Sequence, residues 1–432
     1  MINLSKLLSL AVLAVSVASI INNNAIAKNI AIVDATVHTM TEQGTLTNAT
    51  VLISEGKIQT ILTETPALTG YEIIDGKGKV VTPGLIGAYT SLGLVEVSSS
   101  AGTVDSSSSD NAISKTGAAY DVSYALNPNS SLMAISRIEG ITSAATSMNR
   151  TGQLFTGQGA IITLGQGSSA LMKKSAFVST GVDNGAANNS GGSRAALWVA
   201  LERALDEASY VDGKTFNPQS PWYGISSLDD AIALIPVIKG DIPLMIAAHR
   251  EADLLQVIAL KKRHPKLDVV VLYATEGWKV AEQLAQADIA VILNPESNLP
   301  YEFDQLAATM ENAGRLQKAG VIIAIGMNTH NIRLAKQHAG NAVSHGLPWD
   351  AGLAALTINP AKIFGIDDKV GSLSKGKQAD VVVWSGDPME VAEGAEVVII
   401  NGELVEMTSR QTKLRDRYLQ PSNGKSVHYT RP

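Results

Sequence analysis

Apolar residues in the long central part of the chain form short continuous runs separated by stretches with helical spacing. The runs that we expect to be buried strands cover residues 80–86, 141–145, 160–164, 244–248, 269–273, 290–293 and 321–325. Residues 193–208 and 252–263 each place their apolar side chains on one helical stripe. Continuous apolar strands alternating with helices are typical of parallel βα units that are buried on both faces. The pattern predicts an α/β fold with seven or eight such units, which fits a (β/α)8 TIM-like barrel.

An open, doubly wound sheet is the alternative arrangement of the same units. Such sheets often carry a Gly-x-Gly-x-x-Gly turn after their first strand, and this chain has no such turn. The barrel is therefore the preferred interpretation.

The two ends of the chain have a different pattern. Residues 29–63 contain short alternating runs broken by Gly44 and by the polar turn at 55–57, and residues 371–402 repeat this style. Short alternating strands with polar turns predict antiparallel hairpins. We place the domain boundaries at 28–83 and 84–365, with 366–432 as the second β-rich end and tail.

The first 27 residues have the pattern of a secretory signal peptide. Lys6 precedes the apolar run at 7–21, and the small residues Ala25 and Ala27 resemble a cleavage site. The run is shorter than the roughly 20 residues that a bilayer span needs. We expect an exported, periplasmic protein without a stable membrane span after cleavage, and an uncleaved anchor is the alternative.

Composition and charge narrow the function classes. The 432 residues are 45% apolar, which suits a large core, and 34 basic against 40 acidic residues leave a net charge of −6. Without a basic cluster, nucleic acid is not an expected partner. The absence of cysteine excludes disulfides, thiolate nucleophiles and Cys-based metal sites, so any metal would need His, Asp, Glu or a modified Lys. A homo-oligomer is left open.

Two segments rich in Gly, Ser and Asn interrupt the pattern at 98–109 and 181–193. They are interpreted either as surface loops or as a mobile lid, because each lies where a barrel places its active-site loops.

Three stretches of the chain carry a family resemblance. Residues 80–93 read VVTPGLIGAYTSLG, residues 355–362 read ALTINPAK, and residues 371–384 read GSLSKGKQADVVVW. In this order they resemble the start of the barrel, its closure and the return to the flanking domain in the amidohydrolase superfamily, and most closely its imidazolonepropionase-like branch. The resemblance implies a barrel with a β-sandwich formed by both chain ends. It also implies a hydrolase that acts on amide, cyclic amide or amidine bonds of a small molecule, with one or two divalent cations such as zinc.

The family's metal ligands are mostly substituted here. Its first strand ends in His-x-His, where this chain has Tyr89 and Ser91. A phenol is a poor substitute for imidazole because it loses its proton only near pH 10 or so. His249 matches the histidine at the end of the fifth strand and is the one remaining candidate ligand. Tyr273 stands near the next histidine position.

The eighth strand also departs from the family pattern. Asn328 stands where the family has an aspartate, and an amide can orient a water but cannot take its proton. His330 and Arg333 follow in the same loop, His330 as a general base or substrate contact, or simply as a loop histidine. No bridging lysine is assigned, because Lys173 and Lys174 precede rather than end a predicted strand.

We predict His249, His330 and Asn328 as catalytic residues and Tyr89, Ser91, Tyr273 and Arg333 as substrate contacts, with weak or absent metal binding. Three hypotheses remain: a hydrolase of non-peptide C–N bonds with an altered or single-cation site, a pseudoenzyme that binds a ligand or serves as a scaffold, and a metal-free hydrolase using His249 or His330 as its base.

Overall fold

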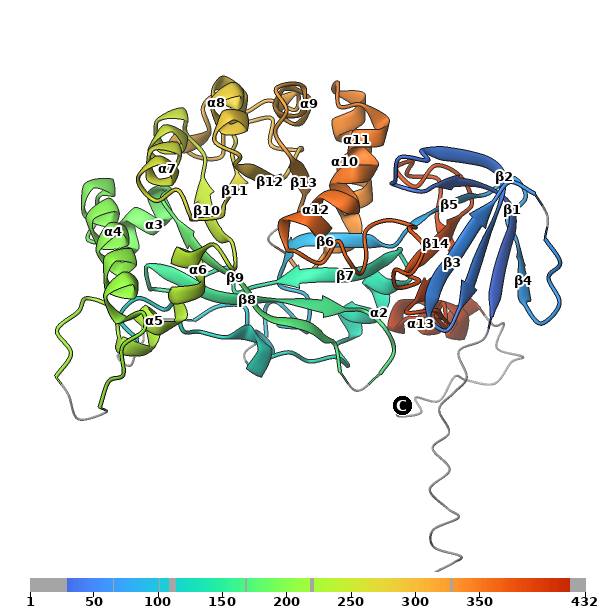
Figure 1. The fold of residues 1–432 in the computed structure, drawn as a ribbon, viewed down its shortest axis with the longest axis horizontal. Coiled ribbons are helices and arrows are strands. Elements are labelled where there is room, and N and C mark those ends of the chain that lie inside the picture. The colour runs from blue at the N-terminus through green and yellow to red at the C-terminus, as the bar shows by residue number, and fades with distance from the viewer. Residues whose placement is uncertain are drawn as a thin grey trace, which may run out of the picture.

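The computed structural model describes residues 29–419 apart from 65, 101, 109–113, 168, 218–220 and 327–328. The predicted signal peptide and Asn328 therefore lie outside the described residues. Two sheets organise the molecule, a barrel sheet surrounded by helices and a second sheet beside it (Figure 1).

Eight strands form the barrel sheet in sequence order. They are β6 (Leu85–Thr90), β7 (Ile141–Thr146), β8 (Phe155–Thr163), β9 (Leu171–Gly181), β10 (Leu244–Ala248), β11 (Val269–Tyr273), β12 (Ala290–Leu293) and β13 (Ile323–Ile325). A bridge between Thr90 and Thr329 brings the two ends of the sheet together, so the barrel is nearly closed. The TIM-like barrel predicted from the apolar runs is confirmed.

One strand of the barrel runs against the others, which corrects the prediction of uniformly parallel units. β8 pairs antiparallel with both β7 and β9. The connections at 147–154 and 164–170 are too short for the crossover of about a dozen residues that parallel neighbours need, so both form hairpins. β9 itself was not predicted, because Lys173, Lys174 and Ser175 interrupt its apolar pattern.

Helices cover the outside of the barrel, and one short helix reaches its lumen. The outer helices that follow the later strands are α4 (Arg194–Val211), α7 (Glu251–Arg263), α8 (Ala281–Gln286), α9 (Asn312–Lys318), α10 (Ala335–Ser344) and α11 (Trp349–Leu356). Leu197, Leu201 and Leu205 of α4 are fully buried, as the predicted stripe requires. After α12 (Ile358–Ile363), the ring of Phe364 packs on Phe177 of β9, with ring centroids 5.4 Å apart.

Shorter helices connect or flank these elements. They are α2 (Ser131–Arg137), α3 (Asn184–Asn189), α5 (Leu228–Ala233), α6 (Ile235–Lys239) and α13 (Arg410–Leu419). In the described part of the chain, the helices are all too short or too polar to span a bilayer.

The second sheet combines strands from both ends of the chain (Figure 1). Its strands are β1 (Ile30–His38), β2 (Thr45–Ser54), β3 (Lys57–Leu62), β4 (Glu72–Asp75), β5 (Val80–Pro83), β14 (Val381–Trp384), β15 (Ala395–Ile400) and β16 (Glu403–Leu404). β5 and β14 pair antiparallel and join the two halves. These strands belong to one connected sheet, and its arrangement as a two-layered sandwich stays a prediction.

Gly84 marks the passage from the second sheet to the barrel. The strand predicted over 80–86 is in fact two strands, β5 and β6, which meet at this residue. The Gly84 N–H donates to the carbonyl of Asp380 at 2.9 Å, and a Cβ at this position would collide with Thr142. Only glycine allows this close approach without displacing a neighbour.

Candidate active site at the carboxyl end of the barrel

A cavity of about 490 Å³ opens at the carboxyl ends of the parallel barrel strands. Tyr89 of β6, Thr180 of β9, Ala247 of β10 and Tyr273 of β11 form its floor and walls. This end of a barrel is where its enzymes build their active sites. The cavity is therefore the candidate functional site.

Tyr89 and Ser91 occupy buried positions at the end of β6. Their exposed fractions are 5% and 1%, and Ser91 Oγ has no hydrogen-bond partner among the described residues. Burial raises the pKa of Tyr89, while the hydroxyls of Ser179 and Ser147 act in the opposite direction. The phenol is consequently a neutral hydroxyl at physiological pH.

His249 follows β10 and is held by polar contacts on one side of its ring. Its Nδ1 lies 2.8 Å from Thr275 Oγ1 and 3.4 Å from Gln305 Nε2. Gln305 Oε1 accepts the Tyr301 N–H at 3.2 Å, which leaves the amide nitrogen facing the imidazole. An amide nitrogen only donates, so Nδ1 is assigned as the acceptor and Nε2 as the nitrogen that carries hydrogen.

The charge state of His249 follows from its surroundings. Burial lowers the pKa of the imidazole, and the carboxylates of Asp183 and Asp304 raise it in part. The net direction is downward, so His249 is mostly neutral near pH 7. The ring therefore carries one N–H donor and no positive charge.

The chain is strained where β11 ends beside His249. Tyr273 and Ala274 have φ of 73° and 42°, which is the left-handed region that non-glycine residues seldom adopt. The Ala274 N–H donates to Ala248 O at 2.9 Å, and Asn312 Nδ2 donates to Ala274 O at 2.9 Å. Such strain persists only where the surroundings enforce it, and it is common at functional sites.

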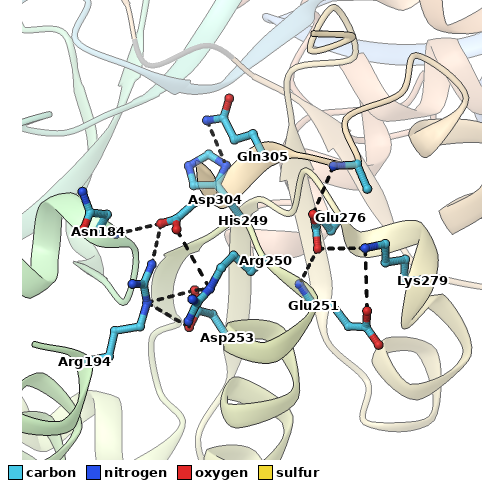
Figure 2. A network of polar contacts seen from close by, with 11 residues as sticks. Asn184, Arg194, His249, Arg250, Glu251, Asp253, Glu276, Lys279, Asp304 and Gln305 are labelled. Carbon is cyan, nitrogen blue, oxygen red and sulfur yellow. Dashed lines mark hydrogen bonds and ion pairs between the residues drawn. The ribbon is translucent and has the colours of Figure 1, made fainter. Parts of the chain in front are cut away.

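Two arginines and two aspartates connect the loops around the site (Figure 2). Asp253 accepts hydrogen bonds from Arg194 at 3.1 Å and from Arg250 at 2.8 Å. Asp304 pairs with Arg194 and accepts the Asn184 N–H at 2.9 Å. The network thus joins the segments that follow β9, β10 and β12, and its carboxylates are used structurally.

Glu276 has a similar structural role next to this network (Figure 2). Its carboxylate accepts the backbone N–H groups of Glu251 at 3.0 Å and Ala307 at 3.1 Å, and pairs with Lys279 at 3.1 Å. Burial alone would raise the pKa of Glu276, but these donors bring it below its ordinary value. A carboxylate so fully occupied is not available as a base.

The described residues do not fit the metal centre that the family resemblance implies. They contain no group of three or more His, Cys, Asp or Glu placed to hold a metal ion. Tyr89 and Ser91 are neutral hydroxyls, and His249 Nδ1 is already occupied. Lys173 lies inside β9 rather than before a strand, but its Nζ donates to Phe364 O at 2.8 Å, away from the cavity.

The predicted site residues divide into three groups. Tyr89 and Tyr273 line the cavity, whereas Ser91, His249, His330 and Arg333 are not among its lining residues. Burial lowers the pKa of the half-buried His330, and Arg333 Nε is buried without a hydrogen-bond partner in the described chain. Asn328 lies outside the described residues. The roles of all seven stay predictions.

The cavity also contains two charged residues that the sequence did not single out. Arg150 is the only cation and Asp183 the only carboxylate among its lining residues. Asp183 is the second residue after β9, so recognising that strand would have placed it at a barrel strand's carboxyl end. The segment predicted as a loop at 181–193 also contains α3, which Asp183 caps.

Comparison with known proteins agrees with the fold. Residues 258–405 match the Amidohydrolase family. An amidohydrolase from Thermotoga maritima is similar in structure, with a TM-score of 0.77, 24% identity, and coverage of 87% of this chain and 99% of that one.

Curated relatives match over shorter segments. An imidazolonepropionase of Shewanella oneidensis is 33% identical over 111 residues, 24% of each chain. A 5-methylthioadenosine/S-adenosylhomocysteine deaminase of Halothermothrix orenii is 27% identical over 199 residues, 40% of this chain and 42% of the relative. The chain thus spans less than half the length of these relatives.

The barrel, its flanking sheet and the cavity at the strand ends define a TIM-like barrel protein with a candidate site at the carboxyl ends of its strands. The match of residues 258–405 to the Amidohydrolase family, the similar segments of curated relatives and the shared fold support membership of the amidohydrolase superfamily.

Proposed function

We propose that the protein is a hydrolase of non-peptide C–N bonds, of the cyclic amide or amidine class, whose site departs from the family's metal centre. Membership of the superfamily supports the reaction class, and two relatives are an imidazolonepropionase and a deaminase by name. The observation that carries the proposal is the arrangement of His249, a neutral imidazole whose Nδ1 is engaged and whose Nε2–H is free to donate.

The proposed chemistry uses the chain's own side chains. The Nε2–H of His249 and the hydroxyl of Tyr89 would donate to the oxygen of the scissile carbonyl and stabilise the negative charge that develops there. His330, a neutral imidazole after the eighth barrel strand, would take a proton from the attacking water. Water adds to the carbonyl carbon, the C–N bond breaks, and the proton held by His330 passes to the leaving nitrogen. For a cyclic amide the ring opens, and the single product carries both the new carboxylic acid and the new amine.

A non-catalytic binding protein is the second candidate. It is favoured by Tyr89 and Ser91, two buried neutral hydroxyls at the positions where the family has paired imidazoles. On this hypothesis the cavity keeps its ligand but has lost the hydrolytic step.

Turnover of a panel of cyclic amides, amidines and amides by the purified protein separates the two. The hydrolase proposal expects product formation that His249→Gln and His330→Gln each reduce by about 10² or more. Full activity in both variants would refute the assigned roles, and binding without turnover in any member of the panel would favour the binding protein.

Metal analysis of the same preparation tests the altered site. Protein purified without chelator is expected to hold under about one equivalent of zinc, manganese or iron, because the described residues contain no group of three or more ligands placed around one point. Two tightly bound cations would show that the site is a conventional metal centre.

We further propose that the protein is exported to the periplasm. The proposal is supported by Lys6, the apolar run at 7–21 and Ala25-Ile26-Ala27, all outside the described residues. Intact mass of protein recovered from a periplasmic fraction should place the new N-terminus at Lys28. A membrane-bound form that retains residues 1–27 would contradict export with cleavage.

A further inference from the structure

Only two charged residues, of opposite sign, line the cavity at the carboxyl end of the barrel. Arg150 and Asp183 are its only charged lining residues, and most of its other polar lining is neutral amide and hydroxyl. Arg150 lies in the loop after β7, and Asp183 lies in the loop after β9. One positive and one negative group therefore face the same cavity from different loops.

Neither of these charges is balanced by an ion pair with another described residue. Arg150 and Asp183 do not pair with each other, and the described residues offer the Arg150 side chain neither a hydrogen bond nor an ion pair. Asp183 uses Oδ1 to accept the Ala186 N–H at 2.8 Å, but no described residue contacts its Oδ2 through a hydrogen bond. By contrast, the neighbouring Asp253 and Asp304 are fully engaged with Arg194 and Arg250.

The backbones that carry the two charges are held in place. Arg150 O accepts the Ser108 N–H at 2.9 Å, and a bridge joins Arg150 to Ser107. The Val182 N–H, next to Asp183, donates to Ala247 O at 2.8 Å. The separation between the two charges is thus set by strand ends and paired loops rather than by free segments.

A ligand that carries both a carboxylate and an ammonium complements this arrangement. A guanidinium can bind a carboxylate through two parallel hydrogen bonds, and a carboxylate is a suitable acceptor for an ammonium group. A ligand with one charge would leave the other charged group of the cavity without an opposite charge. A volume of about 490 Å³ is within the usual range for small-molecule sites and accommodates an amino acid.

We propose that the cavity binds a zwitterionic α-amino acid, with its carboxylate on Arg150 and its ammonium on Asp183. The neutral amides and hydroxyls of the lining, including those of Asn149, Thr156 and Thr180, are left to contact the polar side chain of the ligand. The inference rests on the proposed function for its reaction, hydrolysis of a non-peptide C–N bond. It widens the substrate class from cyclic amides and amidines to an amino acid whose side chain carries that bond in an open-chain carboxamide or ureido group.

Binding measured by isothermal titration calorimetry tests the proposal without requiring turnover. The probes are L-glutamine and L-citrulline, each compared with its methyl ester, which lacks the carboxylate, and its N-acetyl derivative, which lacks the ammonium. At least one free amino acid should bind, and each modification should weaken its binding about tenfold or more.

Two charge-neutralising variants assign the contacts. Arg150→Gln should weaken binding of the free amino acid about tenfold. Binding of the methyl ester should stay unchanged, because the ester does not use the guanidinium. Asp183→Asn should weaken binding of the free amino acid but leave binding of the N-acetyl form unchanged. The amide oxygen of the new asparagine can still cap α3. Lys262→Gln and Asp229→Asn, which neutralise exposed charges outside the cavity, should leave all affinities unaltered.

Three outcomes would overturn the proposal. The first is that neither free amino acid binds up to about 10 mM, and the second is that the free and modified forms bind equally well. The third is that Arg150→Gln weakens the binding of all forms by the same factor. Turnover of uncharged cyclic amides together with any of these outcomes would reject the zwitterionic ligand but keep the hydrolase. Binding as expected without turnover would keep the ligand and reject the hydrolase.

Discussion

His249 stacks on Tyr273, with ring centroids 5.1 Å apart and planes inclined by only 10°. The two residues end neighbouring strands of the barrel, and the family resemblance places a metal-binding histidine near each of them. Near the second of these positions the chain has Tyr273, whose phenol ring packs flat against the imidazole of His249. This stacking helps to hold the His249 ring in place, as a bound cation would in a metal centre.

Burial of neutral His249 predicts a pH dependence of stability. Because its pKa is lower in the folded protein than in the unfolded chain, the unfolded chain binds more protons as pH falls below about 6.5. Stability should therefore fall with pH from that point. His249→Gln removes this contribution, so the loss of free energy of unfolding between pH 7.5 and pH 5 or so should be smaller than in the wild type, with a slope difference of at most about 1.4 kcal/mol per pH unit.

Chemical denaturation at several pH values checks this expectation. His345→Gln, which removes an exposed imidazole on α10's C-terminal side, is the matched control. A variant at His249 with the same or a steeper pH dependence than the wild type would contradict the assignment of a buried neutral ring.

Gln305 should determine which nitrogen of His249 carries the proton. In the wild type, selective ¹⁵N labelling of histidine and NMR should show hydrogen on Nε2, because Gln305 donates to Nδ1. Gln305→Glu should place a carboxylate at Nδ1, raise the pKa of His249 and move the hydrogen to Nδ1. Gln305→Met is the uncharged control. Hydrogen on Nδ1 in the wild type would disprove the donor role proposed for Nε2.

The network at Asp304 should contribute to stability more than a surface ion pair does. Asp304→Asn weakens the contact with Arg194 while the arginine stays partly buried, so we expect a loss of about 1–3 kcal/mol in the free energy of unfolding. Glu311→Gln breaks the exposed pair with Arg315 and should cost at most about 1 kcal/mol. Equal effects in urea denaturation would mean that Asp304 is no more than a surface contact.

Restoring the family's ligands tests how far the site geometry has diverged. The triple variant Tyr89→His, Ser91→His and Asn328→Asp replaces two imidazoles and the carboxylate, although the position near Tyr273 stays unfilled. If His249 can still turn towards a cation, the folded variant should bind one zinc ion, which metal analysis after dialysis would detect. A folded variant without metal would show that the contacts of His249 with Thr275 and Gln305 prevent ligation.

The local pattern of apolar residues was sufficient to predict much of the barrel. Strands β10, β11 and β12 were predicted with the bounds that they have, because a strand buried on both faces must be apolar throughout. The place of His249 at the end of the fifth strand followed from the same pattern. β9 was missed because Lys173 and Lys174 occupy its first part, where Lys173 finds the Phe364 carbonyl, a contact that no local pattern reveals.

The sequence by itself determined the fold class, since apolar runs and helical stripes can be buried together in few ways, and its resemblance to the family predicted substitutions at the family's ligand positions. Only the tertiary structure decided that β8 runs antiparallel, that His249 is neutral with an engaged Nδ1, and that Arg150 and Asp183 face one cavity unpaired. These properties depend on groups far apart along the chain, such as His249 and Gln305. Their distances and desolvation are set by how the strands and loops pack, and no local pattern encodes them.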